Sequence, residues 1–176
     1  MRLFVLFLAL LPALTTLTAP PARAQVAIGK FIESWQTIRR SLRDTGENSC
    51  QAIQCETEYC ASNRAFVLFA TSSNDYIVPS FNHGVMVAKG TKVRLQVGGK
   101  SYALVNTSKG PDKFLAPTNR RDLDGILRDL RRVEAAGGAR KFQVIDSKGR
   151  KVVFSARGTL GVFKEFKRAC GTTIPR

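Results

Sequence analysis

Residues 91–105, TKVRLQVGGKSYALV, form the clearest structural unit in the sequence. Hydrophobic Val93, Leu95 and Val97 alternate with polar residues, which is the period of a strand with one buried and one solvated face. Gly98-Gly99 follows, and two consecutive glycines supply the positive φ angles of a tight hairpin turn. Residues 100–105 then return as a second strand, so the sequence predicts an antiparallel β-hairpin.

Other strands are predicted on both sides of this hairpin. Residues 139–157 carry two further strand patterns around the turn Ser147-Lys148-Gly149. Upstream, residues 64–71 (RAFVLFAT), 76–81 (YIVPSF) and 83–90 (HGVMVAKG) are rich in β-branched and aromatic residues. We expect Pro79 to interrupt the middle one, and we place His83 in a turn containing Gly and Asn.

Two helices are predicted. The first starts at 117–119 and ends at Gly137-Gly138, with hydrophobic residues recurring every three or four positions from Leu123 to Val133. Its arginines and aspartates, Asp129 among them, are expected on the solvated face. The second helix covers residues 159–170, ends before Gly171 and carries Cys170 on its inner face.

The segment before residue 64 is harder to interpret. Residues 25–43 contain Phe31, Trp35 and Ile38 at helical spacing, yet the same segment also alternates as a strand would. Residues 44–63 contain turn-forming residues and three cysteines, and we expect a loop there. At least five short strands and two helices, without regular β-α-β alternation, predict an α+β fold with an antiparallel, β-sandwich-like sheet.

The N-terminal region has the order of a secretory signal peptide. Arg2 precedes an apolar stretch at 3–14, and Ala22-Arg23-Ala24 forms a cleavage motif. The apolar run is shorter than the roughly 20 residues of a membrane-spanning helix. We expect cleavage after Ala24, which leaves residues 25–176 as one domain that is periplasmic, outer-membrane-associated or secreted.

The cysteines predict disulfides rather than a metal site. Their number is even, and in an exported chain three pairings are possible among Cys50, Cys55, Cys60 and Cys170. Cys170, at the end of the predicted last helix, is a natural anchor for a bridge back to the other three. The spacing lacks the C-x2-C pair of structural zinc sites, and His83 is the only histidine. We expect neither metal nor cofactor.

The chain is strongly basic. It contains 28 Lys and Arg against 13 Asp and Glu, a net charge of +15 that becomes +13 without Arg2 and Arg23. Such a charge attracts polyanions, which outside the inner membrane are lipopolysaccharide, anionic headgroups and surface glycans, whereas nucleic acid is not an expected partner. The predicted polyanion-binding residues are Arg128, Arg131, Arg132, Arg140, Lys141, Lys148, Arg150 and Lys151.

Motifs of common enzyme classes are absent from the sequence. A Ser-His-Asp or Cys-His arrangement needs a histidine as its base, and His83 is the only one in the sequence. The H-E-x-x-H motif and the phosphate-binding glycine motifs do not occur. We therefore predict a non-enzymatic protein. The alternative is an exported enzyme or protease inhibitor with its site on the cysteine-rich loop, because a disulfide-pinned loop is pre-organised for binding.

Several motifs resemble one family. "FIESWQ" at 31–36, "SCQAI" at 49–53, the residues 89–105, the helix "DLDGILRDLRR" and the segment from "GGARKFQVID" to "KRACG" are together similar to the invasion-associated locus B family of exported alphaproteobacterial proteins. Two features depart from the family pattern: "ARGTLGVF" stands where "SLSGF" is usual, and Cys55 and Cys60 are additional.

The resemblance implies an envelope or secreted protein of β-sandwich type, associated with bacterial entry into host cells and with virulence. It implies no catalytic residues. It also implies that Cys50 pairs with Cys170, which leaves Cys55 and Cys60 for a short local bridge. Together with the charge, it predicts an interaction protein whose basic surfaces engage an anionic envelope or host-surface component, be it lipopolysaccharide, glycan or protein.

Overall fold

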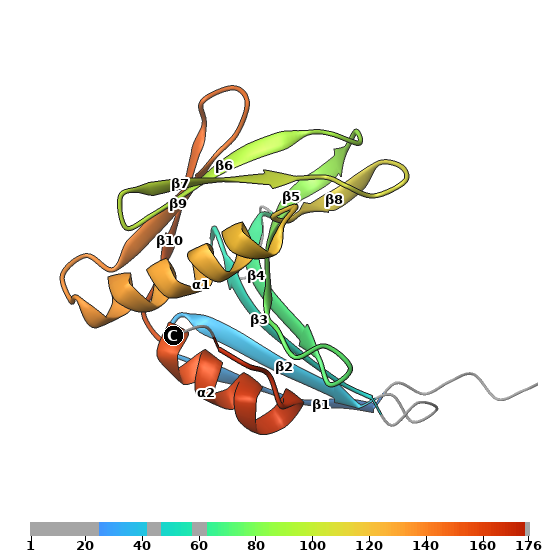
Figure 1. Ribbon diagram of the computed structural model, residues 1–176, viewed down its shortest axis with the longest axis vertical. Helices are drawn as coiled ribbons and strands as arrows, with labels where there is room; N and C mark the ends of the chain where they lie inside the picture. Colours follow the sequence, from blue (N-terminus) through green and yellow to red (C-terminus); the bar gives the residue numbers. More distant parts are fainter. Residues whose placement is uncertain (1–24, 42–46, 58–62, 175–176) are drawn as a thin grey trace, which may run out of the picture.

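The computed structural model describes residues 25–41, 47–57 and 63–174, which form an α+β fold of two antiparallel sheets and two helices (Figure 1). The first sheet has the order β1-β2-β3-β4-β5-β8. Its strands are β1 (Gln25–Ile32), β2 (Trp35–Ser41), β3 (Asn48–Cys55), β4 (Ala65–Thr71), β5 (Val78–Val87) and β8 (Asp112–Leu115). The second sheet has the order β10-β9-β6-β7. Its strands are β6 (Lys92–Val97), β7 (Lys100–Val105), β9 (Lys141–Ile145) and β10 (Lys151–Ser155).

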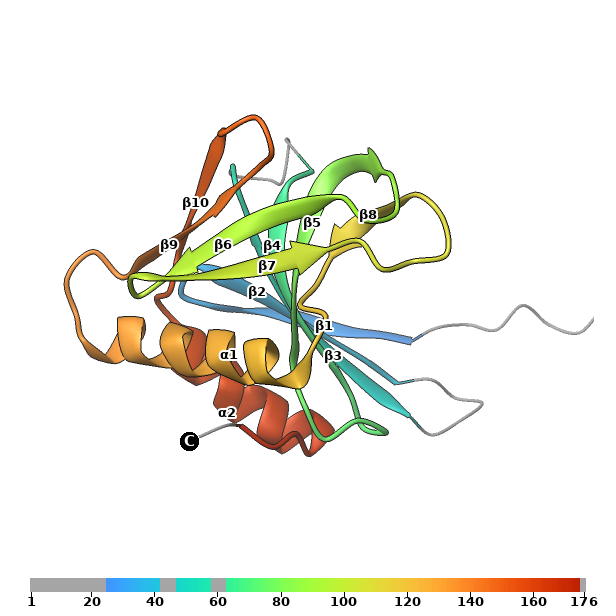
Figure 2. The same ribbon diagram turned by 45° about the horizontal axis from the view of Figure 1, so that its top comes forward.

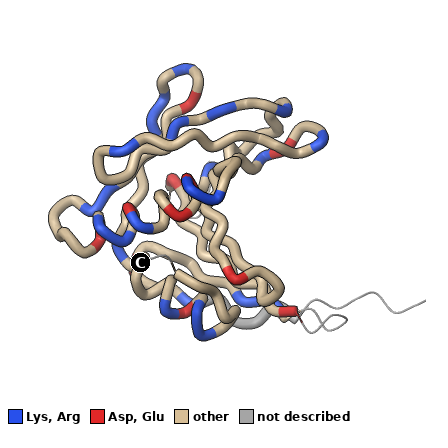
Figure 3. Tube along the Cα trace, viewed as in Figure 1, with Lys and Arg blue, Asp and Glu red and all other residues tan. Residues whose placement is uncertain are grey.

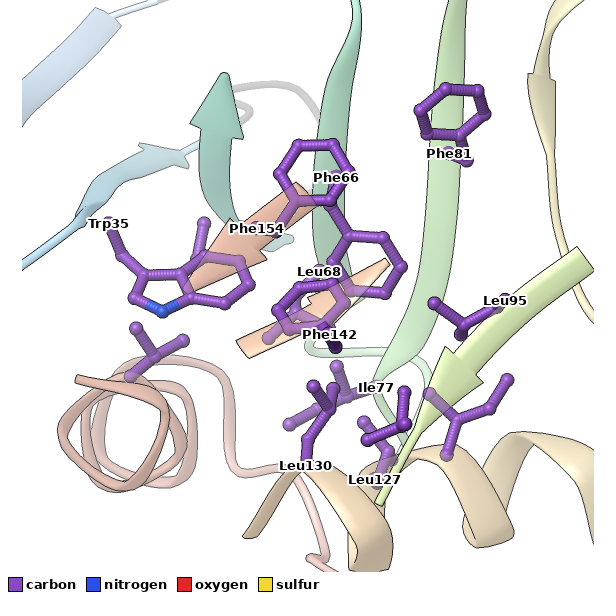
Figure 4. Packing of buried hydrophobic residues seen from close by; sticks show 14 of the residues in the cluster. Trp35, Phe66, Leu68, Ile77, Phe81, Leu95, Leu127, Leu130, Phe142 and Phe154 are labelled. Atoms are coloured by element: carbon purple, nitrogen blue, oxygen red, sulfur yellow. The ribbon is translucent and has the colours of Figure 1, made fainter. Parts of the chain in front are cut away.

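The two sheets face each other across an aromatic core, as a β-sandwich requires (Figures 2 and 4). Phe66 of β4 meets Phe142 of β9 edge to face, with ring centroids 4.8 Å apart. Phe142 in turn stacks on Phe154 of β10 at 5.4 Å. A bridge between Val105 and Ala116 links the sheets at the β7–β8 corner. Burial of these rings and their mutual geometry both stabilise the packing.

The helices close the remaining sides of the core. Helix α1 (Arg120–Ala135) contacts β5 and β6, one strand from each sheet, and buries Leu127 and Leu130 (Figure 4). Helix α2 (Thr159–Cys170) packs on β2, β3 and β4. Both helices have the boundaries expected from their caps, because Asn119 caps the start of α1 and Gly171, at φ 67°, ends α2.

The hairpin predicted at 91–105 is confirmed as β6 and β7. Val93, Leu95 and Val97 are buried, and Val97 pairs with Lys100 across the turn. Gly98 and Gly99 have φ angles of 56° and 81°. The hairpin of β9 and β10 is likewise confirmed. In residues 25–43, the described part adopts the strand alternative, because β2 pairs with β1 on one side and β3 on the other.

The expected loop at 44–63 is wrong for residues 48–55. These form β3, a strand between β2 and β4 that buries Cys50, Ala52 and Gln54 on one face. Its polar composition concealed the alternation. Gln54 tolerates burial because its amide nitrogen donates to the Ser34 carbonyl and its amide oxygen accepts from the Ser155 backbone.

Two smaller expectations about the strands are also wrong. Pro79 lies within β5 instead of breaking it, opposite Leu68 and outside the residues of β5 that pair with β8. A proline is tolerated there because this part of β5 pairs with a strand on one side only. His83 also lies in β5 rather than in a turn, at a bulge where the register to β8 shifts between Asn82 and Val87.

The Cys50–Cys170 disulfide implied by the family resemblance is confirmed, with a Cα–Cα distance of 6.3 Å. It joins β3 to the last residue of α2. Cys55 is also disulfide-bonded, while its expected partner Cys60, like the expected signal peptide at 1–24, lies outside the described residues. Within the described ranges, no helix is long and apolar enough to span a membrane.

Candidate functional site

The second half of α1 presents a concentration of exposed arginines (Figure 3). Arg128, Arg131 and Arg132 lie three and four positions apart on the side away from the core, as helical geometry requires. With Ala135 they line a shallow hollow of about 380 Å³. The hollow is small, but three of the four residues that line it are arginines.

Two of these three arginines have no ion-pair partner among the described residues. Arg132 lies 3.3 Å from the carboxylate of Asp129. Arg128 and Arg131 form no ion pair with any residue that the structure describes. Their guanidinium groups are therefore available to an external anion, for which arginine offers bidentate hydrogen bonding.

The expectation that Asp129 lies on the solvated face of α1 is wrong. Asp129 is buried, with only 3% of its surface exposed. It accepts a 2.5 Å hydrogen bond from the hydroxyl of Tyr102, and Lys100 lies 3.3 Å away. Burial, followed by the hydrogen bond to Asp129, raises the pKa of Tyr102 well above its usual value. The cluster fastens the β6–β7 hairpin to α1 and gives Arg132 an anchored partner.

Gly125 makes this contact possible. A Cβ at this position would lie 3.0 Å from the ring and the hydroxyl of Tyr102, closer than side chains normally tolerate. The glycine in the middle of α1 thus allows Tyr102 to reach Asp129 across the helix surface. Sequence patterns alone do not indicate this role, although a glycine inside a helix is a sign of close packing.

Three further cations lie beside the last turn of α1. The Arg140 carbonyl accepts from the backbone of Ala156 at 2.5 Å, so Arg140 lies beside the residue that precedes Arg157; its side chain is half-buried, and its Nε is buried without a hydrogen-bond partner among the described residues. The Gly158 N–H donates to Glu134 of α1 at 2.8 Å, which places the exposed Arg157 next to the helix end. Lys141 opposes Ser155 in the same hairpin. We refer to this surface as the basic band, made up of Arg128, Arg131, Arg132, Arg140, Lys141 and Arg157.

The structure separates the other three predicted residues from the basic band. Lys148, Arg150 and Lys151 lie at or beside the β9–β10 turn, and Lys151 pairs with Ile145 at the end of the hairpin opposite Lys141 (Figure 1). Arg150 is also partly neutralised, because its Nε lies 2.6 Å from Asp146. Five of the eight predicted polyanion-binding residues are thus brought together, and Arg157 is an additional member that sequence patterns did not single out.

The carboxylate of Asp146 is held in its charged form. Burial alone would raise its pKa, but hydrogen bonds from the Arg150 side chain and from the Arg150 and Lys148 backbone outweigh that effect, and the pKa is lowered. Asp146 thereby orders the β9–β10 turn, because it accepts hydrogen bonds from the backbone of Lys148 and Arg150. This role is structural, and it reduces the charge that the turn offers to a ligand.

A second concave surface lies beside Cys55. It is a groove of about 940 Å³ between the β1–β2 turn, the end of β3 and strand β10. Phe31 and Val153, both exposed hydrophobic residues, line it together with Glu33 and Glu56. Its lining contains no Lys or Arg among the described residues, in contrast to the rest of this basic chain.

The described residues offer no metal site. No group of three or more His, Cys, Asp or Glu side chains within them is arranged to hold an ion. His83 is half-buried against Phe81, with ring centroids 6.1 Å apart. Burial lowers its pKa, nearby Arg150 and Arg64 act in the same direction, and Asp146 opposes them.

Comparisons with protein-family models, with curated proteins and with solved structures found no match to this chain.

Proposed function

We propose that this protein is an exported, non-enzymatic binding protein that engages anionic polymers or headgroups, such as lipopolysaccharide or a sulfated glycan, through the basic band. The observation that carries this proposal is the pair Arg128 and Arg131, exposed on one helix face without a described ion-pair partner. The resemblance to the invasion-associated locus B family and the expected signal peptide support a place in the periplasm, at the outer membrane or outside the cell, with a role in host-cell entry.

The chemistry of the basic band suits phosphate and sulfate groups. Guanidinium forks bind such groups through paired, charge-assisted hydrogen bonds. Because all members of the band except the half-buried Arg140 are exposed, its interactions are screened by salt over about 8 Å at physiological ionic strength. The net charge of +13 that remains without Arg2 and Arg23 adds a long-range attraction that accelerates encounter with any polyanion.

The test measures binding of the purified, disulfide-bonded protein to heparin and to lipopolysaccharide over a range of salt concentrations. The double substitution of Arg128 and Arg131 by glutamine should weaken binding about tenfold or more, equivalent to about 1.4 kcal/mol. The matched control replaces Lys148 and Arg150 by glutamine, which removes the same formal charge at the β9–β10 turn and should weaken binding less. Equal losses in both variants, or binding that salt does not weaken, would contradict the proposal.

The groove beside Cys55 favours the alternative function, an exported enzyme or protease inhibitor. Its apolar walls, the carboxylate of Glu33 and that of Glu56, which is paired with Arg64 at 2.9 Å, could accommodate an extended peptide or substrate. A screen for hydrolase activity and for protease inhibition tests this alternative. Activity that is retained in the Arg128 and Arg131 variant but lost on Glu33→Gln would place function in the groove instead of the basic band.

A further inference from the structure

Exposed hydrophobic side chains gather where β5 and β8 meet. Val85 is 59% exposed, Met86 58% and Phe114 47%, and these are three of the five large exposed hydrophobic residues in the described chain. In the register of the two strands, Asn82 lies opposite Phe114 and Val87 opposite Asp112. The bulge that contains Val85 and Met86 therefore lies alongside Phe114.

This part of β5 projects from the body of the protein. Val85 and Met86 are consecutive and both exposed, so no part of the described chain covers either side chain. Figures 1 and 2 show the end of β5, the loop after it and the loop before β8 extending beyond the two sheets. The hydrophobic residues thus lie on a protrusion rather than in a groove.

A buried asparagine holds the protrusion together. Asn106, only 1% exposed, donates from its amide to the carbonyls of Val87 at 2.9 Å and Gly110 at 3.3 Å. Its side-chain oxygen accepts from the Ser108 backbone at 2.9 Å, and its backbone carbonyl accepts from Gly90 at 2.8 Å. One residue therefore fixes the two loops that carry Lys89 and Lys109.

Lysines lie close in sequence to the exposed hydrophobic residues. Lys89, Lys109 and Lys113 are all exposed on these loops and on β8. Residues 83–115 contain six Lys and Arg but a single acid, Asp112. The carboxylate of Asp112 is occupied by the Ser108 hydroxyl and the backbone of Lys113 and Phe114, which lower its pKa. We refer to Val85, Met86, Phe114, Lys89, Lys109 and Lys113 as the tip.

We propose that the tip docks on an anionic lipid bilayer, with Val85, Met86 and Phe114 inserted at the level of the headgroups and the three lysines bound to lipid phosphates. Apolar side chains flanked by basic residues are the combination that binds membrane interfaces. Each lysine held near an anionic surface adds attraction. A convex protrusion suits a deformable lipid interface, since it offers a protein partner no groove to fill.

The tip is separate from the basic band. The band lies on the second half of α1 and beside its last turn, whereas β8 precedes the first turn of α1 (Figure 1). A helix of 16 residues is about 24 Å long, so the two surfaces lie toward opposite ends of α1. The protein can therefore contact a bilayer through the tip while the band faces another anion.

Insertion is tested directly with a fluorescent reporter. Phe114→Trp should shift its emission to the blue and be quenched by brominated lipid when phosphatidylcholine vesicles containing phosphatidylglycerol are added. The matched control is Phe31→Trp, because Phe31 is 75% exposed but lies on β1 beside the groove. It should show neither change. Trp35 is fully buried and gives the same background in both variants.

Co-sedimentation with the same vesicles separates the tip from the basic band. Val85→Ser combined with Met86→Ser should weaken sedimentation about tenfold or more while heparin binding is unchanged. A triple substitution, Lys89→Gln, Lys109→Gln and Lys113→Gln, should also weaken sedimentation, because it removes the attraction to anionic lipid. Three results would each overturn the proposal. The first is an equal fluorescence change in Phe114→Trp and Phe31→Trp, the second is no fluorescence change in Phe114→Trp although that variant sediments with the vesicles, and the third is no sedimentation of the protein at low salt.

Discussion

The carboxylate of Glu134 in the last turn of α1 accepts a 2.8 Å hydrogen bond from the backbone N–H of Gly158, the residue that caps the start of α2. The same carboxylate accepts the N–H of Leu160. Gly158 has no side chain with which to cap its own helix, so α1 provides the acceptor that α2 lacks. A negative charge is also favourable at a helix N-terminus, because the helix dipole is positive there.

Replacing Glu134 by alanine should lower the free energy of unfolding by about 2 kcal/mol, because it leaves the buried N–H of Gly158 and the half-buried N–H of Leu160 without an acceptor. Urea titration followed by circular dichroism measures this change. The control on the same helix is Asp124→Ala, which removes an exposed ion pair with Arg120 and should cost less than about 0.5 kcal/mol. Similar losses in the two variants would show that the cap contributes no more than a surface ion pair.

Gly158→Ala should be more damaging than Gly171→Ala. Both glycines have positive φ angles, 86° and 67°, so each substitution incurs the cost of a left-handed alanine, about 1 kcal/mol. At Gly158 the new Cβ would also lie 2.6 Å from the carbonyl oxygen of Ile32, whereas at Gly171 it would meet nothing within 4 Å. We expect a further loss of about 1–3 kcal/mol at Gly158. Thermal unfolding of the two variants compares them, and equal midpoints would contradict the close contact.

The Cys50–Cys170 disulfide should contribute about 2–5 kcal/mol to stability, because it closes a loop across a sequence separation of 120 residues. The double variant Cys50→Ser and Cys170→Ser should therefore unfold at lower urea concentration. Peptide mapping without reduction checks the pairing and also tests the expected partnership of Cys55 with Cys60. An unchanged urea midpoint would mean that the bridge adds nothing to the packing of α2 on the sheet.

His83 should make the protein less stable as the pH falls. Its pKa is lowered in the folded state, chiefly by burial, so near the ordinary value of 6.5 the unfolded chain binds the proton more readily than the folded one. Stability is therefore greatest above that pH and declines as pH falls through 6.5 toward the folded pKa. His83→Gln should flatten the decline in unfolding midpoint between about pH 7 and pH 5. Identical slopes in the variant and the original chain would exclude this contribution.

Local patterns in the sequence were sufficient for the hairpin of β6 and β7, the hairpin of β9 and β10, and both helices. In each case the evidence lies within a few residues: alternation in the strands, glycines in the turn at 98–99, and the cap residues Asn119 and Gly171. Such signals depend on backbone conformation and on short-range hydrogen bonds, which the sequence encodes directly.

The identity of β3 could not be read in the same way. Its residues are polar enough to look like a loop, and only pairing with β2 and β4 makes them a central strand. The same holds for the choice between helix and strand in residues 25–41. Strand formation depends on neighbours distant in the sequence, so local propensity decides little where the pattern is mixed.

The α+β class, the positions of the helices and the large positive charge follow from the residues alone. Which charges lie together depends on the folded chain. Chain folding brings Arg157 to the end of α1, moves Lys148 and Arg150 to the far end of a hairpin, and buries Asp129 and Glu134. The physical reason is that charge and periodicity are properties of the residues, whereas burial and ion pairing depend on what the folded chain places beside them.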